Sequence, residues 1–318
     1  MYDIERSSSV IYRSLLRKGV KVDIVRMEWN DFEKNAEFLK AIFPADSKLY
    51  YYAFFHHDPF FHPSRILSVV DEGEVMSTLW SLPRIFHNGD NTFHAVGIAN
   101  VGTVEKARGR GLASYLMDEA VELAKKGGDD FAVLVTDIPA FYSRWDFHDL
   151  GKYYADIPAR SSLRGITNRK AEATDILKAS SGFYQKLDLT VPLRNPASMR
   201  ALAERNRWSS HFTSGERLPE WIAVQEPSGT LLYVYRTERE DRIDVHEFFW
   251  EQETHKENVV NLLSSFGSMT GKTVRAFHHP RILSEVGLSP LKDKETIMFA
   301  RFSACDPGYV HLPQPEFF

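Results

Sequence analysis

A strand, a glycine-containing turn, a helix and a second strand follow one another between residues 92 and 137. The stretch "TFHAVGIANVGTV" has the composition of a strand, and "FAVLVTD" is an apolar run typical of a strand buried on both faces. Between them, apolar residues recur with helical spacing and Gly127-Gly128 ends the pattern: Leu112, Leu116, Ala120 and Leu123. This order predicts a β–α–β crossover, which places the two strands in one sheet.

The turn before this helix, "ARGRGLA", has two glycines where a helix start normally carries a capping side chain. Gly109 and Gly111 let an anion approach the main chain, and the first amides of the helix have no intrahelical partner. Arg108 and Arg110 add positive charge at the rim. The P-loop motif is absent and the dinucleotide fingerprint does not fit this position, so we expect another kind of pyrophosphate. The alternative is a flexible turn that binds nothing.

The rest of the first half predicts an α/β fold with a mixed sheet. From Lys21, "VDIVRM" alternates like a strand and "NDFEKNAEFLKAIF" has helical spacing. The next stretch, residues 44–64, is aromatic and proline-punctuated, and we expect a helix plus a loop there. Three strands then follow as hairpins, joined by "EG" and "HNGDN", and "LGKYYADI" predicts a last strand for this half.

The second half repeats this order of elements, ending in the strand pattern "ETIMFARF". Between the halves the chain becomes rich in Pro, Ser and Gly, which indicates a boundary near residue 160. We therefore expect an N-terminal flexible or docking segment at residues 1–20, a first domain at 21–160 and a second copy of it at 161–318.

The charge and composition argue against several classes of protein. The net charge is −4 and there is no long basic run, which argues against a nucleic-acid or anionic-membrane surface. The single cysteine, Cys305, excludes an internal disulfide, and there is no export signal or apolar run long enough to span a membrane. We therefore expect a cytoplasmic protein with a small or neutral partner, and its oligomeric state stays open.

Two motifs together resemble the GNAT-type acyl-CoA N-acyltransferases. Arg108, Gly111 and Ala113 meet the family's R-x-x-G-x-G/A signature, and "FAVLVTDIPAFYSRWDF" resembles its buried strand, short loop and F-Y-x-x-x-G-F ending. The resemblance covers residues 21–156 closely and 165–303 loosely. It implies a GNAT fold, with a mixed, mostly antiparallel sheet flanked by helices, in two tandem copies.

The resemblance also implies acetyl-CoA as cosubstrate. Its pyrophosphate would lie on the amides of residues 109–114, and its pantetheine arm would pair with the end of the strand at Val101–Thr103, where the partner strand diverges at Val135–Thr136. The residues implied to bind it are Val101, Gly102, Thr103, Arg108, Gly109, Arg110, Gly111, Leu112, Ala113 and Ser114.

Tyr142 matches the position of the family's usual general acid. The leaving thiolate needs a proton, and a tyrosine with an ordinary pKa of about 10 still carries one at neutral pH. The alternative is a tyrosine that serves only in packing. Asp146 stands where the family has glycine, and Asp tolerates the left-handed conformation better than most residues.

The residues that bind and deprotonate the amine are less defined. "FFHHDPFFHP" lies where the family places its acceptor loop, so Phe55, His56 and His57, together with Glu28, are candidates for substrate binding, and the alternative is aromatic packing under a loop. The candidate bases are Glu28, His56, His57 and Glu105, or a water relay. The histidines lack metal-site spacing, and we expect no metal.

The tandem arrangement resembles the "enhanced intracellular survival" acetyltransferases, without their sterol-carrier-like domain. The second copy carries "EQETHKEN" at the corresponding helix start, and its acidic, glycine-free sequence predicts that this degenerate copy does not bind CoA. By analogy with that family, the carboxylate of Phe318 is a hypothetical base.

We therefore expect an acetyl-CoA-dependent N-acetyltransferase that acts on a primary amine by direct attack in a ternary complex. The alternative is a non-catalytic acyl-CoA-binding sensor or interaction module. The sequence leaves the acceptor open among aminoglycosides, polyamines, amino acids and protein lysines.

Overall fold

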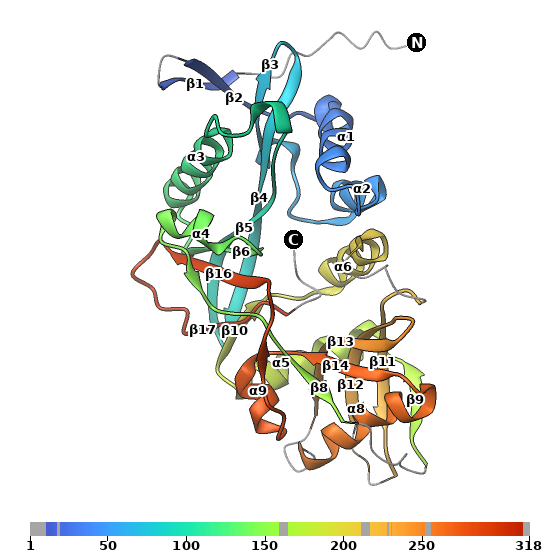
Figure 1. Ribbon diagram of the computed structural model, residues 1–318. Helices are drawn as coiled ribbons and strands as arrows, with labels where there is room; N and C mark the ends of the chain where they lie inside the picture. Colours follow the sequence, from blue (N-terminus) through green and yellow to red (C-terminus); the bar gives the residue numbers. More distant parts are fainter. Residues whose placement is uncertain are drawn as a thin grey trace.

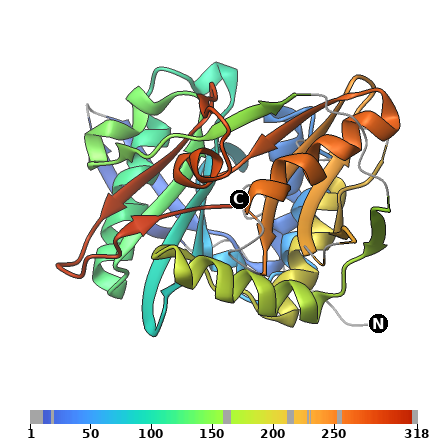
Figure 2. The same cartoon turned by 90° about the horizontal axis from the view of Figure 1, so that it is seen from below.

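The computed structural model contains two β-sheets, each covered by helices. It describes residues 11–17, 20–158, 165–210, 217–227, 229, 231–251 and 256–313. In Figure 1 the first sheet lies above the second, and in Figure 2 the blue-to-green strands and the orange strands occupy opposite sides of the molecule. Each sheet has its own buried apolar cluster, so the hydrophobic core is divided between them.

The first sheet is mixed and mostly antiparallel. In spatial order its strands are β1 (Ile11–Arg17), β2 (Val20–Arg26), β3 (Ile66–Asp71), β4 (Glu74–Asn88), β5 (Asn91–Thr103), β6 (Phe131–Thr136), β16 (Thr296–Arg301) and β7 (His148–Asp149). Glu72 and Gly73 turn β3 into β4 with φ angles of 50° and 81°, which confirms the first predicted hairpin. Among neighbours in this order, β5 and β6 are parallel and the other pairs are antiparallel, as the predicted crossover requires.

The N-terminal segment differs from the expectation of a flexible or docking region. Residues 11–17 form β1, which pairs antiparallel with β2. The sequence did not reveal this strand because an edge strand draws its stability from the neighbour with which it pairs. Residues 1–10 lie outside the described part of the chain.

Helices cover both faces of the first sheet. One face carries α1 (Phe32–Ile42) and α2 (Lys48–His57), and the other carries α3 (Leu112–Gly127), as Figure 1 shows. The alternation of β4 separates the two cores, because Leu79 packs in the α3 cluster while the adjacent Trp80 packs in the α1–α2 cluster. This packing fixes the start of α3 beside the end of β5.

The second sheet repeats the crossover. Its strands, in spatial order, are β15 (Leu291–Lys292), β8 (Tyr153–Ile157), β14 (Thr273–Phe277), β13 (Arg242–Trp250), β12 (Leu231–Glu238), β11 (Glu220–Gln225) and β9 (Thr167–Lys170). The helices of the second half are α5 (Ala173–Lys186), α6 (Pro196–Trp208), α8 (Lys256–Thr270) and α9 (Pro280–Glu285). β13 and β14 pair in parallel, and α8 lies between them in the sequence. The second half therefore has the predicted order of elements of the first.

The two halves exchange their last strands. The pattern "LGKYYADI" forms β8, which pairs in the second sheet, and "ETIMFARF" forms β16, which pairs between β6 and β7 in the first. The expectation that each strand completes its own half is therefore wrong. Sequence periodicity identifies a strand but not its partner, and the two sheets offer equivalent positions to both strands.

An ion pair joins the segments that lead into the two exchanged strands, β8 and β16. Lys152 immediately precedes β8 and Glu295 immediately precedes β16, and their Nζ and Oε2 atoms are 2.6 Å apart. Lys152 also lies 3.3 Å from Asp293, and its side chain is 4% exposed. Because loss of Glu295 would leave the buried ammonium group of Lys152 with Asp293 as its remaining ion-pair partner in this cluster, it is expected to destabilise the crossing.

Further segments of the second half pack on the first. β10 (Leu189–Pro192) pairs with β4 and with β17 (Tyr309–Val310), and α6 packs against α2. The second half therefore supplies part of the wall around the first sheet.

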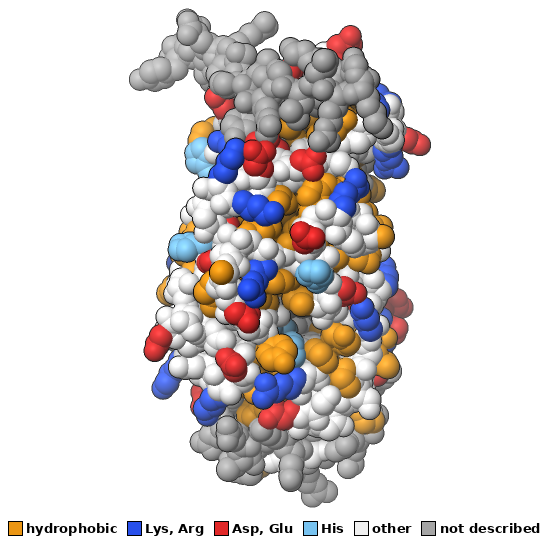
Figure 3. Space-filling view, turned by 90° about the vertical axis from the view of Figure 1, so that its left-hand side faces the viewer, with side chains coloured by type: hydrophobic (Ala, Val, Ile, Leu, Met, Phe, Trp, Pro, Cys, Tyr) orange, Lys and Arg blue, Asp and Glu red, His pale blue; other side chains and the backbone are white. Residues whose placement is uncertain are grey.

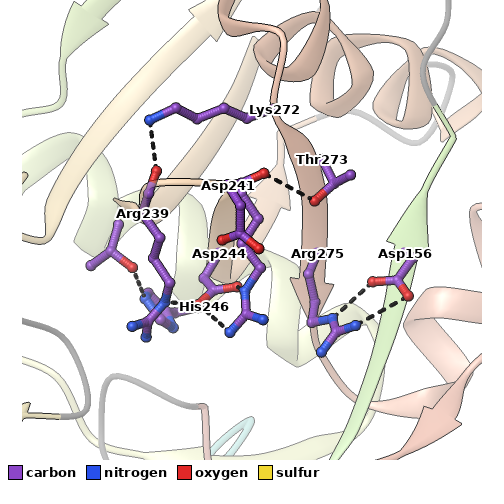
Figure 4. A network of polar contacts seen from close by, with 10 residues as sticks. Asp156, Arg239, Asp241, Asp244, His246, Lys272, Thr273 and Arg275 are labelled. Carbon is purple, nitrogen blue, oxygen red and sulfur yellow. Dashed lines mark hydrogen bonds and ion pairs between the residues drawn. The ribbon is translucent and has the colours of Figure 1, made fainter. Parts of the chain in front are cut away.

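Charged residues hold the paired end of β13 and β14 together, as Figure 4 shows. Arg239 and Arg242 both bind the carboxylate of Asp244, which is 2% exposed. Arg275 donates to Asp156 of the exchanged strand β8 at 2.8 Å. The Arg275–Asp156 pair ties β8 into the second sheet, and the contacts of Asp244 lie at the paired end of β13 and β14.

Because β16 pairs in the first sheet, a substitution in β16 should destabilise that sheet. Met298 is 1% exposed in the core of that sheet, so Met298→Ala should lower the free energy of unfolding by about 2–5 kcal/mol. Amide hydrogen exchange should accelerate in β6, far away in sequence. Leu291→Ala, at a side chain that is 48% exposed, is the control and should change stability by less than about 0.5 kcal/mol. Faster exchange confined to the second sheet would contradict the exchange of strands.

Candidate active site

The parallel pair β5–β6 separates part of the way along. Its register ends at Gly97↔Val133, although both strands continue. A bulge in the β4–β5 ladder lies next to Asn100, whose φ is 52°. On its other edge β6 stays paired with β16 along its whole length, so only the β5 side opens. The divergence predicted at Val135–Thr136 is present.

A cavity of about 450 Å³ lies at this opening. Its wall combines the diverging strands, the α1–α2 connection and two segments from the second half. The residues that line it are Phe43, Asp46, Tyr50, Ile98, Ala99, Asn100, Val101, Val135, Thr136, Asp137, Ile138, Tyr142, Asn206, Ser209, Ser210 and Glu295. This volume falls in the range usual for small-molecule sites.

Tyr142 is one of two buried phenols in this wall, and Tyr50 is the other. Tyr142 ends the short helix α4 (Pro139–Tyr142), it is 7% exposed, and its ring packs edge-on against Phe141 with centroids 4.8 Å apart. Burial, together with the nearby carboxylate of Asp137, raises the pKa of Tyr142 to about 12, while a hydrogen bond with Thr136 acts in the opposite direction. The hydroxyl group therefore keeps its proton at neutral pH.

In the turn after Tyr142, Asp146 stands at the position where the family has glycine. Asp146 adopts the left-handed conformation with φ of 59° and ψ of 26°. Its amide donates to the carbonyl oxygen of Ser143 at 3.2 Å, which closes the turn. Asp146 therefore takes the conformation for which glycine is usual, as expected from its residue type.

The glycine turn before α3 is exposed and open. Gly109 and Gly111 have φ angles of 76° and 78°, in the region that favours glycine. A Cβ added at Gly109 would meet nothing within 4 Å. Arg110 lies 3.8 Å from Asp71, and Arg108 donates to the carbonyl oxygen of Thr103 at 3.4 Å.

The amides at the start of α3 are available. Gly111 is the N-cap and supplies no side chain, and the amides of Leu112, Ala113 and Ser114 make no hydrogen bond among the described residues. The end of β5 leads into this turn. There Val101 lines the cavity, while the carbonyl oxygen of Gly102 accepts from Ser77 at 2.9 Å.

The predicted acceptor residues lie outside the cavity wall. The ring of Phe55 packs on Trp29, with centroids 4.9 Å apart, and on His56 at 4.8 Å. Glu28 precedes Trp29 and caps the following turn, and His57 ends α2. None of Glu28, Phe55, His56 and His57 lines the cavity that contains Tyr142, and their role in substrate binding stays a prediction.

Several cavity residues were not found from the sequence. Asp46 accepts hydrogen bonds from the amide and the hydroxyl of Ser210, at 3.0 and 2.7 Å, which joins the end of α6 to the first half. Glu295 reaches the cavity because β16 is exchanged. No spacing along the chain relates residues 46, 210 and 295, so only the three-dimensional contacts reveal the group. Phe318 lies outside the described residues.

The described residues contain neither a group of side chains that could hold a metal ion nor a helix that could span a membrane. Among residues 11–17, 20–158 and the later described ranges, no group of three or more His, Cys, Asp or Glu side chains is arranged to hold a metal ion. In the same part of the chain no helix combines the length and apolarity needed to cross a membrane.

Comparisons with known proteins agree on the fold. Residues 23–149 match the family described as acetyltransferase (GNAT) domain. No curated protein sequence matches the chain. A GCN5-related N-acetyltransferase from Anabaena variabilis is similar in structure with a TM-score of 0.68 and 13% identity, over 89% of this chain and 74% of that chain.

Two further solved structures also share the fold. Eis1 from Mycobacterium abscessus has a TM-score of 0.52 and 11% identity, over 88% of this chain and 73% of that chain. A tandem GNAT protein from the clavulanic acid biosynthesis pathway has a TM-score of 0.53 and 12% identity, over 90% of this chain and all 100% of its own. The GNAT fold is thus confirmed, with two mixed sheets that agree with a tandem arrangement.

The raised pKa of Tyr142 can be measured directly. The ultraviolet difference between the wild type and Tyr142→Phe, titrated with base, should show one phenol that ionises near pH 12 rather than near pH 10. Circular dichroism at each pH checks that the protein remains folded. A difference spectrum with its midpoint near pH 10 would show that the hydroxyl group is not buried.

Proposed function

We propose that the protein, whose residues 23–149 match the acetyltransferase (GNAT) domain family, moves the acetyl group of acetyl-CoA to a primary amine by direct attack in a ternary complex. One observation carries the proposal. The cavity at the opening of β5 and β6 contains Tyr142, and β5 leads from that cavity into the open glycine turn at the start of α3.

The turn fits a pyrophosphate. Three amides without partners point out of the start of α3, where the helix dipole favours negative charge. The open space at Gly109 admits a phosphate close to the main chain. The diverging end of β5 offers main-chain groups to an extended pantetheine arm. Acetyl-CoA would supply the thioester whose carbonyl carbon accepts the amine nitrogen.

Tyr142 is the proposed general acid. The amine nitrogen forms a bond to the carbonyl carbon, the carbon–sulfur bond breaks, and the hydroxyl proton of Tyr142 goes to the departing sulfur. The tyrosinate then regains a proton released from the nitrogen through solvent, so a neutral amine yields an amide and a thiol. An acceptor that arrives as an ammonium ion releases one further proton to solvent before the attack. The pKa of about 12 keeps the hydroxyl group protonated before the step.

The cavity favours a cationic acceptor. Asp46, Asp137 and Glu295 line it, whereas no Lys or Arg does so among the described residues; Glu295 is paired with Lys152, which lies outside this wall, so Asp46 and Asp137 supply the negative charge. Opposite charge attracts an ammonium group and raises its local concentration. We propose that the proton of the amine leaves through water held by these carboxylates, rather than through the predicted bases Glu28, His56, His57 or Glu105, which do not line the cavity.

A nucleic-acid ligand has little support. Figure 3 shows Lys, Arg, Asp and Glu interspersed over one face of the molecule, without a continuous basic area on it. Together with the net charge of −4, this pattern favours a small amine over a polyanion.

Replacing Tyr142 distinguishes an enzyme from a sensor. Tyr142→Phe removes one hydroxyl group, and kcat for thiol release with a panel of polyamines, aminoglycosides and lysine peptides should fall at least about 100-fold. The Kd for acetyl-CoA, measured by calorimetry, should stay within about twofold. Unchanged turnover would remove Tyr142 from the mechanism. Absence of thioester cleavage by the wild type with every amine of the panel would favour the acyl-CoA sensor.

Two glycines at opposite ends of α3 test the phosphate site. Gly111 and Gly128 have φ angles of 78° and 80°, so alanine at either position should lower stability by a similar amount, about 1–2 kcal/mol. Only Gly111→Ala should also weaken acetyl-CoA binding, by about tenfold or more, because it alters the anion-binding turn. Equal affinities of the two variants for acetyl-CoA would contradict the proposed site.

A further inference from the structure

A second cavity lies at the corresponding opening in the second sheet. β13 and β14 pair only as far as Val245↔Ala276, and a cavity of about 420 Å³ follows. Its wall includes the ends of β13 and β14, the linker before β8, part of β16 and residues 308–313. The parallel pairs β5–β6 and β13–β14 therefore each open into a cavity, and the second cavity lies in the copy that the acetyl-transfer proposal does not use.

The second cavity does not suit CoA. By sequence, the segment 251–258 that leads into α8 has no glycine and contains three glutamates. Negative charge at a helix start opposes a pyrophosphate. The ligand must therefore be identified from the wall of the cavity itself.

The charges in this wall are already neutralised. The pairs are Lys152 with Asp293 and Glu295, Glu247 with Arg194, and Asp149 with Lys292. The Arg194–Glu247 pair has two hydrogen bonds, at 3.0 and 2.7 Å, and both side chains are at most 7% exposed. A charged ligand would lose its hydration without gaining a free counter-charge, which disfavours it.

Four histidines line the wall, and three of them, His278, His279 and His311, pack together. His278 uses both ring nitrogens, since Nδ1 accepts from the amide of His279 at 2.8 Å and Nε2 donates to the carbonyl oxygen of Phe248 at 2.9 Å. Burial lowers the pKa of His278 to about 3 and that of His279 to about 4, so both rings are neutral at pH 7.

His279 is left with a hydrogen-bond donor. Its Nδ1 accepts from the amide of Arg281 at 3.3 Å, so the neutral ring carries its proton on Nε2. That Nε2 has no partner among the described residues. The ring of His311 stacks on His278 with centroids 5.1 Å apart, and its own buried Nε2 also lacks a partner. Unpaired polar atoms in a cavity wall are unfavourable unless a guest pairs with them.

We propose that this cavity is a second binding site, for an uncharged and largely apolar molecule that carries one hydrogen-bond acceptor such as a carbonyl oxygen. The apolar body lies against the remaining wall residues, which include Leu150, Phe277, Ile297, Phe299 and Leu312. The acceptor pairs with Nε2–H of His279. This site is independent of acetyl transfer, because it shares no wall residue with the cavity of Tyr142.

Three probes of nearly equal size test the ligand class: acetophenone, cumene and benzoate. Binding to the full-length protein is followed by amide and histidine-ring NMR shifts, with and without saturating acetyl-CoA. Acetophenone should bind saturably and shift the signals of His279 and His311. Cumene lacks the acceptor and should bind about fivefold to tenfold more weakly, the value of one neutral hydrogen bond. Benzoate, which is charged, should bind more weakly than either.

Two pairs of variants locate the site. Leu150→Trp fills the mouth of the cavity at a side chain that is 37% exposed and should abolish the shifts, whereas Leu291→Trp, at a side chain that is 48% exposed and outside the wall, should not. His279→Phe should make acetophenone and cumene bind equally, whereas His279→Asn keeps a donor and should retain part of the difference.

Each result of these experiments either supports the second binding site or overturns it. Acetophenone shifts lost in Leu150→Trp but kept in Leu291→Trp support the site, whether or not the protein acetylates amines. Absence of saturable binding, tighter binding of benzoate, or shifts that persist in Leu150→Trp overturn it. Cumene binding as tightly as acetophenone to the wild type overturns the assignment of His279 as donor.

Discussion

Hydrogen bonding along the two edges of β6 determines where the first cavity lies. On one edge β16 pairs with β6 from Thr136 to Phe131, and on the other β5 pairs for only three residues before it diverges. Because β6 is held straight by β16, the divergence opens a space on the β5 side alone. The cavity with Tyr142, the end of β5 and the glycine turn all depend on this unequal pairing.

The exchange of β8 and β16 makes the two halves one structure. Each sheet contains a strand from the other half, and the Lys152–Glu295 pair joins the two linkers where they cross. Glu295 thereby enters the wall of the first cavity and Lys152 the wall of the second. The second half therefore does more than cover the first, because it completes its sheet and adds a carboxylate to its cavity.

The sequence predicted the local features and missed the pairing of distant ones. The spacing of Leu112, Leu116 and Ala120 predicted α3, and the two glycines predicted its open start, because these signals lie within one element. Asp46, Ser210 and Glu295 were missed, since they meet only after the strand exchange and the packing of α6. The ring of Phe55 packs against Trp29 and Phe32, and a role for this residue in substrate binding stays a prediction.

A crystal structure of the protein with CoA tests the central claim most directly, because the account rests on one place for the two phosphates. The pyrophosphate should lie on the amides of Leu112, Ala113 and Ser114, and the sulfur should point into the cavity beside Tyr142. CoA bound elsewhere, or diverging strands that close on each other around an empty glycine turn, would contradict it.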